Sequence, residues 1–159
     1  MYDLKKARQY YEEAARLNPQ VDHRLWYQLG RIDFIESDFD GALEKFATQK
    51  EYFGEQQPNV LYMEGLVYGY KARVSSDPAD WRQAELAFIN FLPHASNSPW
   101  TRTDLAWVYF SQGKYEEMLP ILEEGLANLP DQPWLLNMYG LALLNTDKPE
   151  DALNAFLHA

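Results

Sequence analysis

Three histidines and several pairs of adjacent glutamates are the side chains of this sequence best suited to acid–base or metal chemistry. His23, His94 and His158 lie far apart, and none has a second histidine four residues away, the spacing that pairs two metal ligands on one helix face. The glutamate pairs are Glu12–Glu13, Glu116–Glu117 and Glu123–Glu124. Each lies on a predicted helix whose opposite side is apolar, as expected for a solvated face rather than a general acid–base pair. We therefore expect no metal site.

The sequence also lacks the motifs of nucleophilic catalysis and nucleotide binding. It contains no GxSxG, P-loop or GxGxxG pattern, and no Ser or Thr has a neighbouring base in sequence. The absence of cysteine excludes disulfides, thiol nucleophiles and thiolate metal sites. The sequence therefore predicts a protein that is not an enzyme and needs no cofactor.

Composition and charge narrow the class of partner. A hydrophobic fraction of 47% in 159 residues is that of a folded chain. Twenty-four acids against 14 Lys and Arg give a net charge of -10, which argues against nucleic-acid binding. No apolar run is long enough to span a membrane, and the start of the chain lacks the apolar segment of a signal peptide, so we expect a cytoplasmic protein. The aromatic fraction of 15% is high and must serve a core, an interface or both.

Apolar periodicity and capping residues predict helices throughout the chain. Asp77-Pro78 and Ser98-Pro99 each place a capping residue before a proline at the first helical position. The predicted helices cover about 3–17, 22–36, 39–53, 58–75, 78–92, 99–112, 114–128, 132–145 and 148–158.

A repeat organises these helices into pairs. A small residue recurs in the first helix of each pair at intervals of 35, 41 and 34 residues: Gly30, Gly65, Ala106 and Gly140. Twelve residues later the second helix carries Ala42 or Ala152, each followed after four residues by Phe46 or Phe156. Small residues at these places allow two helices to pack closely, and such pairs bury their apolar faces only by stacking.

The segment "WYQLGRID" followed by "ALEKF" resembles the tetratricopeptide pattern W-x2-L-G-x2-Y…A-x3-F…P. The third copy supplies "LAWVY" and ends at Pro130, and the fourth supplies "YGLAL" and "ALNAF". The resemblance implies an all-α, right-handed α-solenoid of antiparallel helix pairs with about nine helices. It implies one array over 1–159, in which a half-repeat at 1–19 precedes repeats at about 22–54, 57–96, 99–130 and 131–159. We expect this array to be a fragment of a longer one.

Departures from the pattern make specific predictions. Asp33 and Glu64 replace Tyr and Leu, and we expect each to reach solvent or to pair with an arginine such as Arg8 or Arg31. Pro120 should kink its helix without ending it. The second repeat has seven extra residues, about two helical turns. Its first helix should therefore extend through "YGYKARVSS" and raise Lys71 and Arg73 above the rim of the array; the alternative is a flexible loop over "VSSDPAD".

The resemblance also implies a function. In tetratricopeptide arrays the first helices line a concave groove that binds an extended peptide or a helix of a protein partner. The residues predicted to face this groove are Tyr27, Arg31, Asn59, Tyr62, Leu66, Tyr70, Trp100, Thr103, Trp107, Trp134 and Asn137. The set is aromatic and aliphatic with a few polar residues, which favours a partner with apolar anchors. The alternative for single apolar residues, such as Phe34, Leu66 and Phe110, is that they pack between adjacent first helices.

The carboxylate clamp of chaperone adaptors is absent. Those adaptors hold a C-terminal carboxylate with Lys, Asn, Asn, Lys and Arg, and the matching residues here are Tyr27, Arg31, Met63, Trp100 and Asp104.

Two further hypotheses concern the ends of the array. Repeat arrays need polar caps, and both terminal helices expose apolar faces, so the chain is alternatively a self-assembly module that forms homo-oligomers. It is otherwise a regulatory segment of a larger protein.

Overall fold

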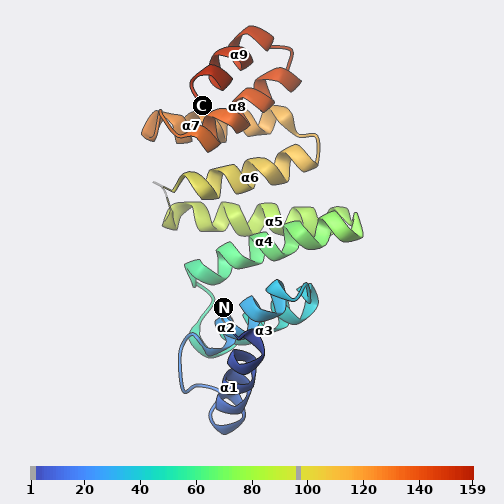
Figure 1. Cartoon of the computed structure of the whole chain (residues 1–159), viewed down its shortest axis with the longest axis vertical. Coiled ribbons are helices and arrows are strands. Elements are labelled where there is room, and N and C mark those ends of the chain that lie inside the picture. Colours follow the sequence, from blue (N-terminus) through green and yellow to red (C-terminus); the bar gives the residue numbers. More distant parts are fainter. Residues whose placement is uncertain (1–2, 96–97) are drawn as a thin grey trace. The chain divides into compact units, whose positions relative to one another are not determined.

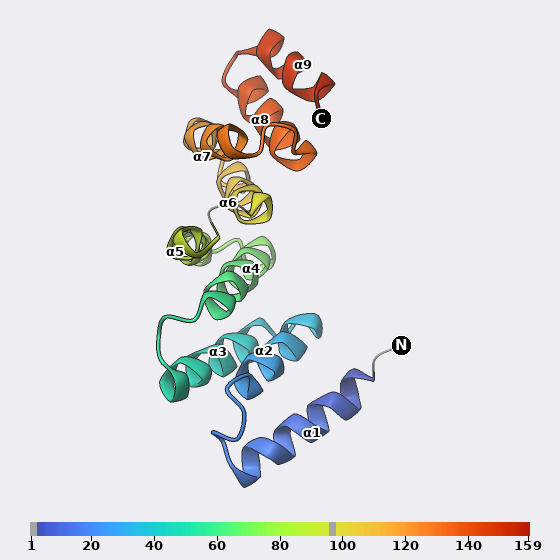
Figure 2. The same ribbon diagram turned by 90° about the vertical axis from the view of Figure 1, so that its left-hand side faces the viewer.

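The computed structural model describes residues 3–95 and 98–159, and all of their regular structure is helical (Figures 1 and 2). The elements are α1 (Leu4–Leu17), α2 (Leu25–Ile35), α3 (Phe39–Phe53), α4 (Pro58–Ser75), α5 (Pro78–Phe91), the short 3-10 helix η1 (Leu92–His94), α6 (Pro99–Ser111), α7 (Tyr115–Asn128), α8 (Pro133–Asn145) and α9 (Pro149–Leu157). Over the described ranges there are nine α-helices and no strand, which confirms the predicted all-α class.

Capping chemistry explains where the helices begin. Five of them, α4, α5, α6, α8 and α9, have proline in the first turn, where its missing N–H leaves no intrahelical hydrogen bond unmade. The carboxylates of Asp3, Asp38 and Asp77 accept a backbone N–H at the starts of α1, α3 and α5.

The turns between the first and second helix of each pair share a residue with a left-handed backbone conformation. Ser37, Ser76, Gly113 and Asp147 occupy corresponding places and have φ of 65°, 59°, 71° and 57°. A left-handed residue at this point ends one helix and reverses the chain for the next. The repetition of this device supports the phase of the repeat predicted from the sequence.

The seven extra residues of the second repeat form helix and not a flexible loop. The first helix α4 has 18 residues and ends ten residues after Gly65, whereas α2, α6 and α8 end five residues after their small residue. The second helix α5 begins six residues before Ala84, whereas α3 begins three before Ala42. Each helix therefore gains about one turn. The predicted extension of the first helix is confirmed.

The chain divides into two compact units, Met1–Ser76 and Asp77–Ala159, at the turn between the helices of the predicted second repeat. In the first unit each helix packs against the next, and α2 also touches α4. Its core joins Ala42 and Phe46 of α3 to Val60, Met63 and Val67 of α4.

The second unit repeats this packing. Each helix from α5 to α9 packs against the next, and the first helices α6 and α8 also touch each other. Gly125 of α7 allows close approach, since a Cβ there would lie 2.8 Å from Cδ of Arg102. Pro120 lies inside α7, which continues past it as predicted.

Both carboxylates that depart from the family pattern have partners. Asp33 is buried, and Oδ1 lies 2.7 Å from a guanidinium nitrogen of Arg8, one of the two arginines predicted for it. Glu64 lies 2.7 Å from the ammonium of Lys50, so its partner is a lysine and not an arginine.

None of the described helices combines the length and the apolar character that crossing a membrane requires.

Candidate functional site: the first-helix face

The eleven residues predicted to face the groove lie on four first helices, and each is at least partly exposed. We call the surface they form the first-helix face, and we describe it separately for each unit. In the first unit it comprises Tyr27 and Arg31 of α2 with Asn59, Tyr62, Leu66 and Tyr70 of α4. In the second it comprises Trp100, Thr103 and Trp107 of α6 with Trp134 and Asn137 of α8.

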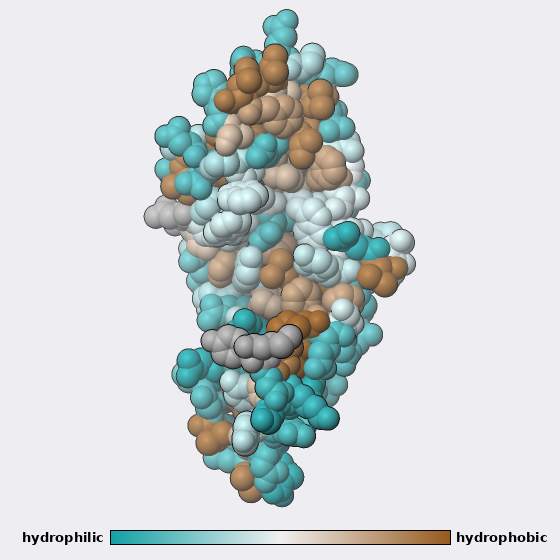
Figure 3. Space-filling model, in the orientation of Figure 1, coloured by the Kyte–Doolittle hydropathy of each residue, from teal (hydrophilic) through white to brown (hydrophobic). Residues whose placement is uncertain are grey.

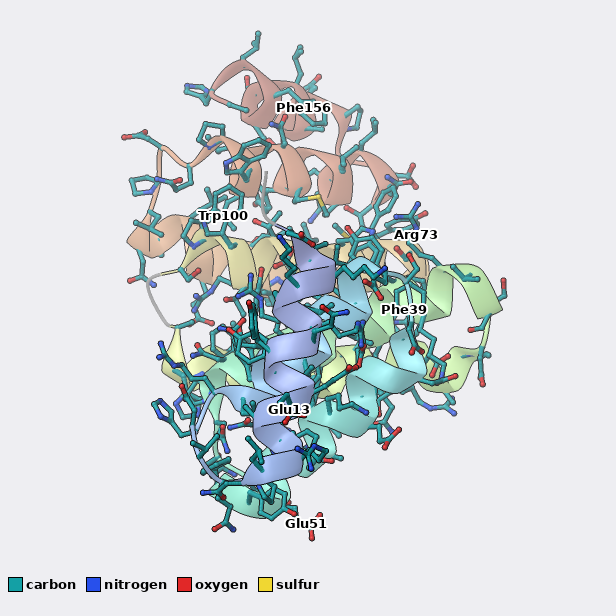
Figure 4. All side chains as sticks on the ribbon, turned by 60° about the horizontal axis from the view of Figure 1, so that its bottom comes forward. Glu13, Phe39, Glu51, Arg73, Trp100 and Phe156 are labelled. Atoms are coloured by element: carbon teal, nitrogen blue, oxygen red, sulfur yellow. The ribbon has the colours of Figure 1, made fainter. Side chains whose placement is uncertain are left out.

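Two tryptophans meet at the start of α6 and α8. The ring centroids of Trp100 and Trp134 are 5.4 Å apart with planes inclined at 39°, and each residue remains 52% exposed. Figure 4 shows Trp100 on α6. Sequence reasoning placed both residues on this face, and the structure brings them into contact.

Trp107, two turns further along α6, has a different environment. Its ring meets that of Trp81 on α5 edge-to-face, at a centroid distance of 5.6 Å. The residue is partly buried. Trp107 thus contributes to the packing of α5 on α6 as well as to the surface.

Polar groups of the second unit flank the tryptophan pair. The hydroxyl of Thr103 donates to the carbonyl of Pro99, 2.8 Å away, and is thereby committed to its own helix. Asn137 is exposed, one turn after Trp134. Asn137 therefore remains available to hydrogen-bond a partner.

In the first unit, Tyr27 and Asn59 share a cleft of about 200 Å³ between the starts of α2 and α4. Its lining also includes His23, Arg24, Gln49, Gln56, Gln57, Pro58 and Val60. Four of the lining side chains are amides, so the cleft offers both hydrogen-bond donors and hydrogen-bond acceptors.

The buried side chain of Gln49 fixes the walls of this cleft. Its Oε1 accepts the backbone N–H of Tyr27 at 3.0 Å, and its Nε2 donates to the carbonyl of His23 and to Oε1 of Gln57, the latter at 2.9 Å. Gln57 in turn donates to the carbonyl of Gly54 at 2.9 Å. One side chain of α3 thus ties down the start of α2 and the loop before α4.

Several residues of the first-helix face in the first unit contact neighbouring side chains. Arg31 lies over the ring of Tyr27, 5.7 Å from its centroid. The ring of Tyr70 meets Phe34 edge-on at 5.5 Å. Phe34 and Leu66 pack against the core cluster that α3 and α4 form. Met63, which occupies one place of the absent carboxylate clamp, is buried within that core.

The rim of the first unit is partly neutralised. Nζ of Lys71 lies 2.8 Å from Oδ1 of Asp40 on α3, so its charge is paired and does not stand free above the array. Arg73 is exposed near the end of α4 and lies over the ring of Tyr70, 5.8 Å from its centroid (Figure 4).

Two family models match parts of the chain. Models described as "Tetratricopeptide repeat" match residues 99–142 and 2–21. The chain contains tetratricopeptide repeats. Among curated protein sequences, none matches the chain.

Solved structures share the fold of this tetratricopeptide array at low sequence identity. The structure named "Crystal structure of MamA" is 15% identical, with 98% of this chain and 86% of the other covered at a TM-score of 0.83. "MamA 41-end from Desulfovibrio magneticus RS-1" is 16% identical, with 97% and 82% covered at 0.81. "Crystal structure of YrrB: a TPR protein with an unusual peptide-binding site" is 16% identical, with 98% and 76% covered at 0.77.

The tetratricopeptide pattern leads to the exposed aromatic residues but not to Gln49. The signal for Gln49 was present, since it continues the stripe of Ala42 and Phe46 on α3 at helical spacing. A polar residue within an apolar stripe has to be hydrogen-bonded if it is buried. Its partners are backbone groups and an amide from outside the helix, which the repeat pattern does not specify.

Two observations concern the ionisable side chains of the array. Among the described residues, no group of three or more His, Asp or Glu is arranged to hold a metal ion. Burial raises the pKa of Tyr109 to about 12, assisted by Glu85, whose carboxylate accepts from its hydroxyl at 3.3 Å. A phenol with so high a pKa stays protonated near neutral pH and serves as a hydrogen-bond donor.

Proposed function

We propose that this tetratricopeptide array is a non-catalytic scaffold that binds a peptide or helix of a protein partner on its first-helix face, with Trp100 and Trp134 as the principal apolar anchors. The observation that carries the proposal is the pair itself: two large rings in contact, each half exposed, on successive first helices. Water is displaced from a large apolar area when a partner side chain covers them, and tryptophan is enriched among residues that dominate binding energy.

The polar groups near these anchors suit a segment that carries its own hydrogen-bonding groups. In the second unit Asn137 is exposed beside the tryptophan pair. In the first unit the cleft at Tyr27 and Asn59 offers amide groups around a partly buried ring. Hydrogen bonds of this kind set register and direction, while the aromatic contacts supply most of the affinity. The peptide-binding site named for YrrB is consistent with this use of the fold.

The test begins with a display library of random twelve-residue peptides selected against the whole chain. Affinities of selected peptides are then measured by calorimetry for wild type, Trp100→Ala and Trp134→Ala. We expect each substitution to weaken binding by about tenfold or more, since loss of an anchor typically costs at least ~2 kcal/mol. Circular dichroism of each variant should match wild type, because both rings are half exposed.

Two controls carry equivalent changes elsewhere. Tyr10→Ala removes an exposed aromatic ring from α1, and Glu117→Ala removes an exposed charge from α7. Neither should change affinity by more than about twofold. If the folded tryptophan variants bind like wild type, the recognition surface lies elsewhere and the proposal fails.

Self-association through α9 is the second candidate, and one comparison favours it. Phe46 on α3 is fully buried, whereas Phe156, at the corresponding place on α9, is 36% exposed. Its neighbours Leu153 and Leu157 are more exposed still. Figure 3 shows apolar side chains gathered over α8 and α9. Sedimentation of wild type and Phe156→Ser at increasing concentration tests this candidate. A wild-type chain that stays monomeric at high concentration would exclude it.

A further inference from the structure

A second recessed surface lies in the second unit, between the second helices α7 and α9 and above α8. The cleft has a volume of about 410 Å³. Its lining consists of Leu126, Leu136, Tyr139, Leu143, Asp151, Asn154, Ala155 and His158. None of these belongs to the first-helix face, so the cleft is a separate surface of the same unit.

The floor of the cleft is apolar. Leu136, Leu143 and Ala155 are buried beneath it, and Leu143 and Ala155 pack in one core cluster of α8 and α9. Leu126 and the ring of Tyr139 stand partly exposed at its edges. An aliphatic side chain inserted here would therefore contact carbon on several sides.

Two acids lie beside this floor. Asp151 lines the cleft directly. Glu123 accepts a hydrogen bond from the hydroxyl of Tyr139 at 3.2 Å. Burial first, and then Glu123 and Asp151, raise the pKa of Tyr139, which indicates that both carboxylates act on the same edge of the cleft. The ring Nδ1 of His158 lies 2.6 Å from the carbonyl of Asn154, where its N–H donates.

Basic residues do not offset these acids. Residues 77–159 contain twelve Asp and Glu against four Lys and Arg, a net charge of -8 out of the chain's -10. Arg102 lies 2.7 Å from Glu124, and Lys114 lies 2.9 Å from Glu85. No Lys or Arg is part of the cleft lining. The field over the cleft is therefore negative, which attracts cations and repels phosphate groups.

We propose that the cleft between α7 and α9 binds a partner segment in which one or two aliphatic side chains are flanked by Lys or Arg residues. The aliphatic groups would contact Leu126 and the floor, and the cations would approach Asp151 and Glu123. Charge complementarity of this kind gives orientation and a faster association rate, while apolar contact supplies affinity. The same field disfavours nucleic acids, anionic membranes and acidic peptides.

The test uses a defined probe, a fluorescein-labelled peptide of sequence Gly-Lys-Lys-Leu-Leu-Lys-Lys-Gly, with the whole chain. Two control peptides replace every Lys by Glu or both Leu by Gly. We expect binding by the first peptide alone, and shifts of the backbone amide resonances of Leu126, Tyr139 and Asn154 in nitrogen-15 spectra. Equal binding of either control peptide, or shifts confined to other parts of the chain, would overturn the proposal.

Matched variants separate the cleft from the general attraction of an acidic protein. Asp151→Lys changes the charge inside the cleft, and Glu116→Lys makes the same change about 15 Å along α7 from Leu126. At 0.1 M salt, where screening acts over about 10 Å, Asp151→Lys should weaken binding about fivefold or more and Glu116→Lys about twofold or less. Equal losses would show that net charge alone attracts the peptide.

A second pair of variants tests the apolar contribution to peptide binding. Leu126→Ala should weaken binding, whereas Leu153→Ala, an equal truncation at an exposed position of α9 outside the cleft, should not. Trp134→Ala should leave this peptide unaffected, which distinguishes the cleft from the first-helix face. If the chain alone dimerises and the peptide dissociates the dimer, a second copy is the occupant and the proposal is wrong.

Discussion

Gly30 and Phe46 lie so close together that a Cβ at position 30 would be 2.5 Å from Cε1 of the phenylalanine ring. Gly140 and Phe156 repeat this relationship at the same distance in the last helix pair. The two contacts differ in what surrounds the ring. Phe46 is fully buried, partly beneath residues of α4, whereas Phe156 is 36% exposed. The same glycine–phenylalanine contact therefore occurs twice in the chain, once with the ring buried and once with the ring partly exposed to solvent.

Gly30→Ala should therefore destabilise the array more than Gly140→Ala. The buried ring of Phe46 has nowhere to move, and overpacking of a closed core costs about 1–3 kcal/mol. The ring of Phe156 can turn toward solvent. Urea unfolding followed by circular dichroism measures both variants, and we expect the larger fall in midpoint for Gly30→Ala. An equal fall of the urea midpoint in both variants would mean that packing against α4 does not restrict the ring of Phe46.

The ion pair of Arg8 with Asp33 gives a second prediction. Arg8→Ala leaves the buried carboxylate of Asp33 without its cation, and breaking a buried pair costs about 3 kcal/mol. The same arginine lies 2.7 Å from Glu36, which is half exposed, so Glu36→Ala should cost no more than about 1 kcal/mol. Urea unfolding compares the two variants. A similar small loss in both would show that Asp33 reaches water when Arg8 is removed.

Gln49 provides a test of the support beneath the first-unit cleft. Gln49→Leu keeps a side chain of similar size but leaves the N–H of Tyr27 and the carbonyl of His23 without their hydrogen bonds. Unsatisfied buried groups cost about 1–3 kcal/mol each. Amide exchange of Tyr27 should accelerate strongly, while amides in α8 keep their wild-type rates. Unchanged exchange at Tyr27 would show that another group replaces the glutamine.

The fold followed from the sequence because its signals are local and repeated. Spacing of Gly30, Gly65, Ala106 and Gly140 fixed the phase of the pairs, and proline at the starts of helices fixed their boundaries to within a few residues. Even the longer second repeat was predictable, since seven residues preserve the apolar stripe.

The candidate site was less predictable, because it depends on contacts between distant residues. Helical projection placed Trp100, Trp107 and Trp134 on one face, but periodicity does not say that Trp107 meets Trp81 or that Trp100 meets Trp134. The sequence likewise predicted only that Lys71 rises above the rim, and its partner Asp40 lies 31 residues away. Such pairings are set by how helices pack, which a one-dimensional pattern does not encode.

Alkaline titration should reveal the environment of Tyr109. Its pKa is raised to about 12 in the folded protein, above the value of about 10 expected in an unfolded chain. Because the folded pKa is the higher one, its contribution to stability is complete below pH 10 and is lost as pH rises toward 12.

Absorbance at 295 nm measures this directly. Wild type should show a phenol that ionises near pH 12, and Tyr109→Phe should remove that late step. The control Tyr10→Phe changes an exposed tyrosine and should leave the late step in place. A titration of Tyr109→Phe that retains it would assign the late step to another residue.

Substitutions of Trp107 and Trp100, both on α6, should affect different quantities: the first stability, the second peptide binding. Trp107 is partly buried against Trp81, so Trp107→Ala removes packing between α5 and α6 and should lower the free energy of unfolding by about 2 kcal/mol. Trp107→Phe retains an aromatic edge for Trp81 and should lose less than about 1 kcal/mol.

Trp100→Ala removes a ring that is 52% exposed, so its cost in stability should be small and its cost in peptide affinity large. Urea unfolding and calorimetry with the selected peptides, applied to all three variants, give the two quantities independently. A Trp107→Ala variant that unfolds like wild type but no longer binds would place Trp107 among the anchors and would make its contact with Trp81 energetically unimportant.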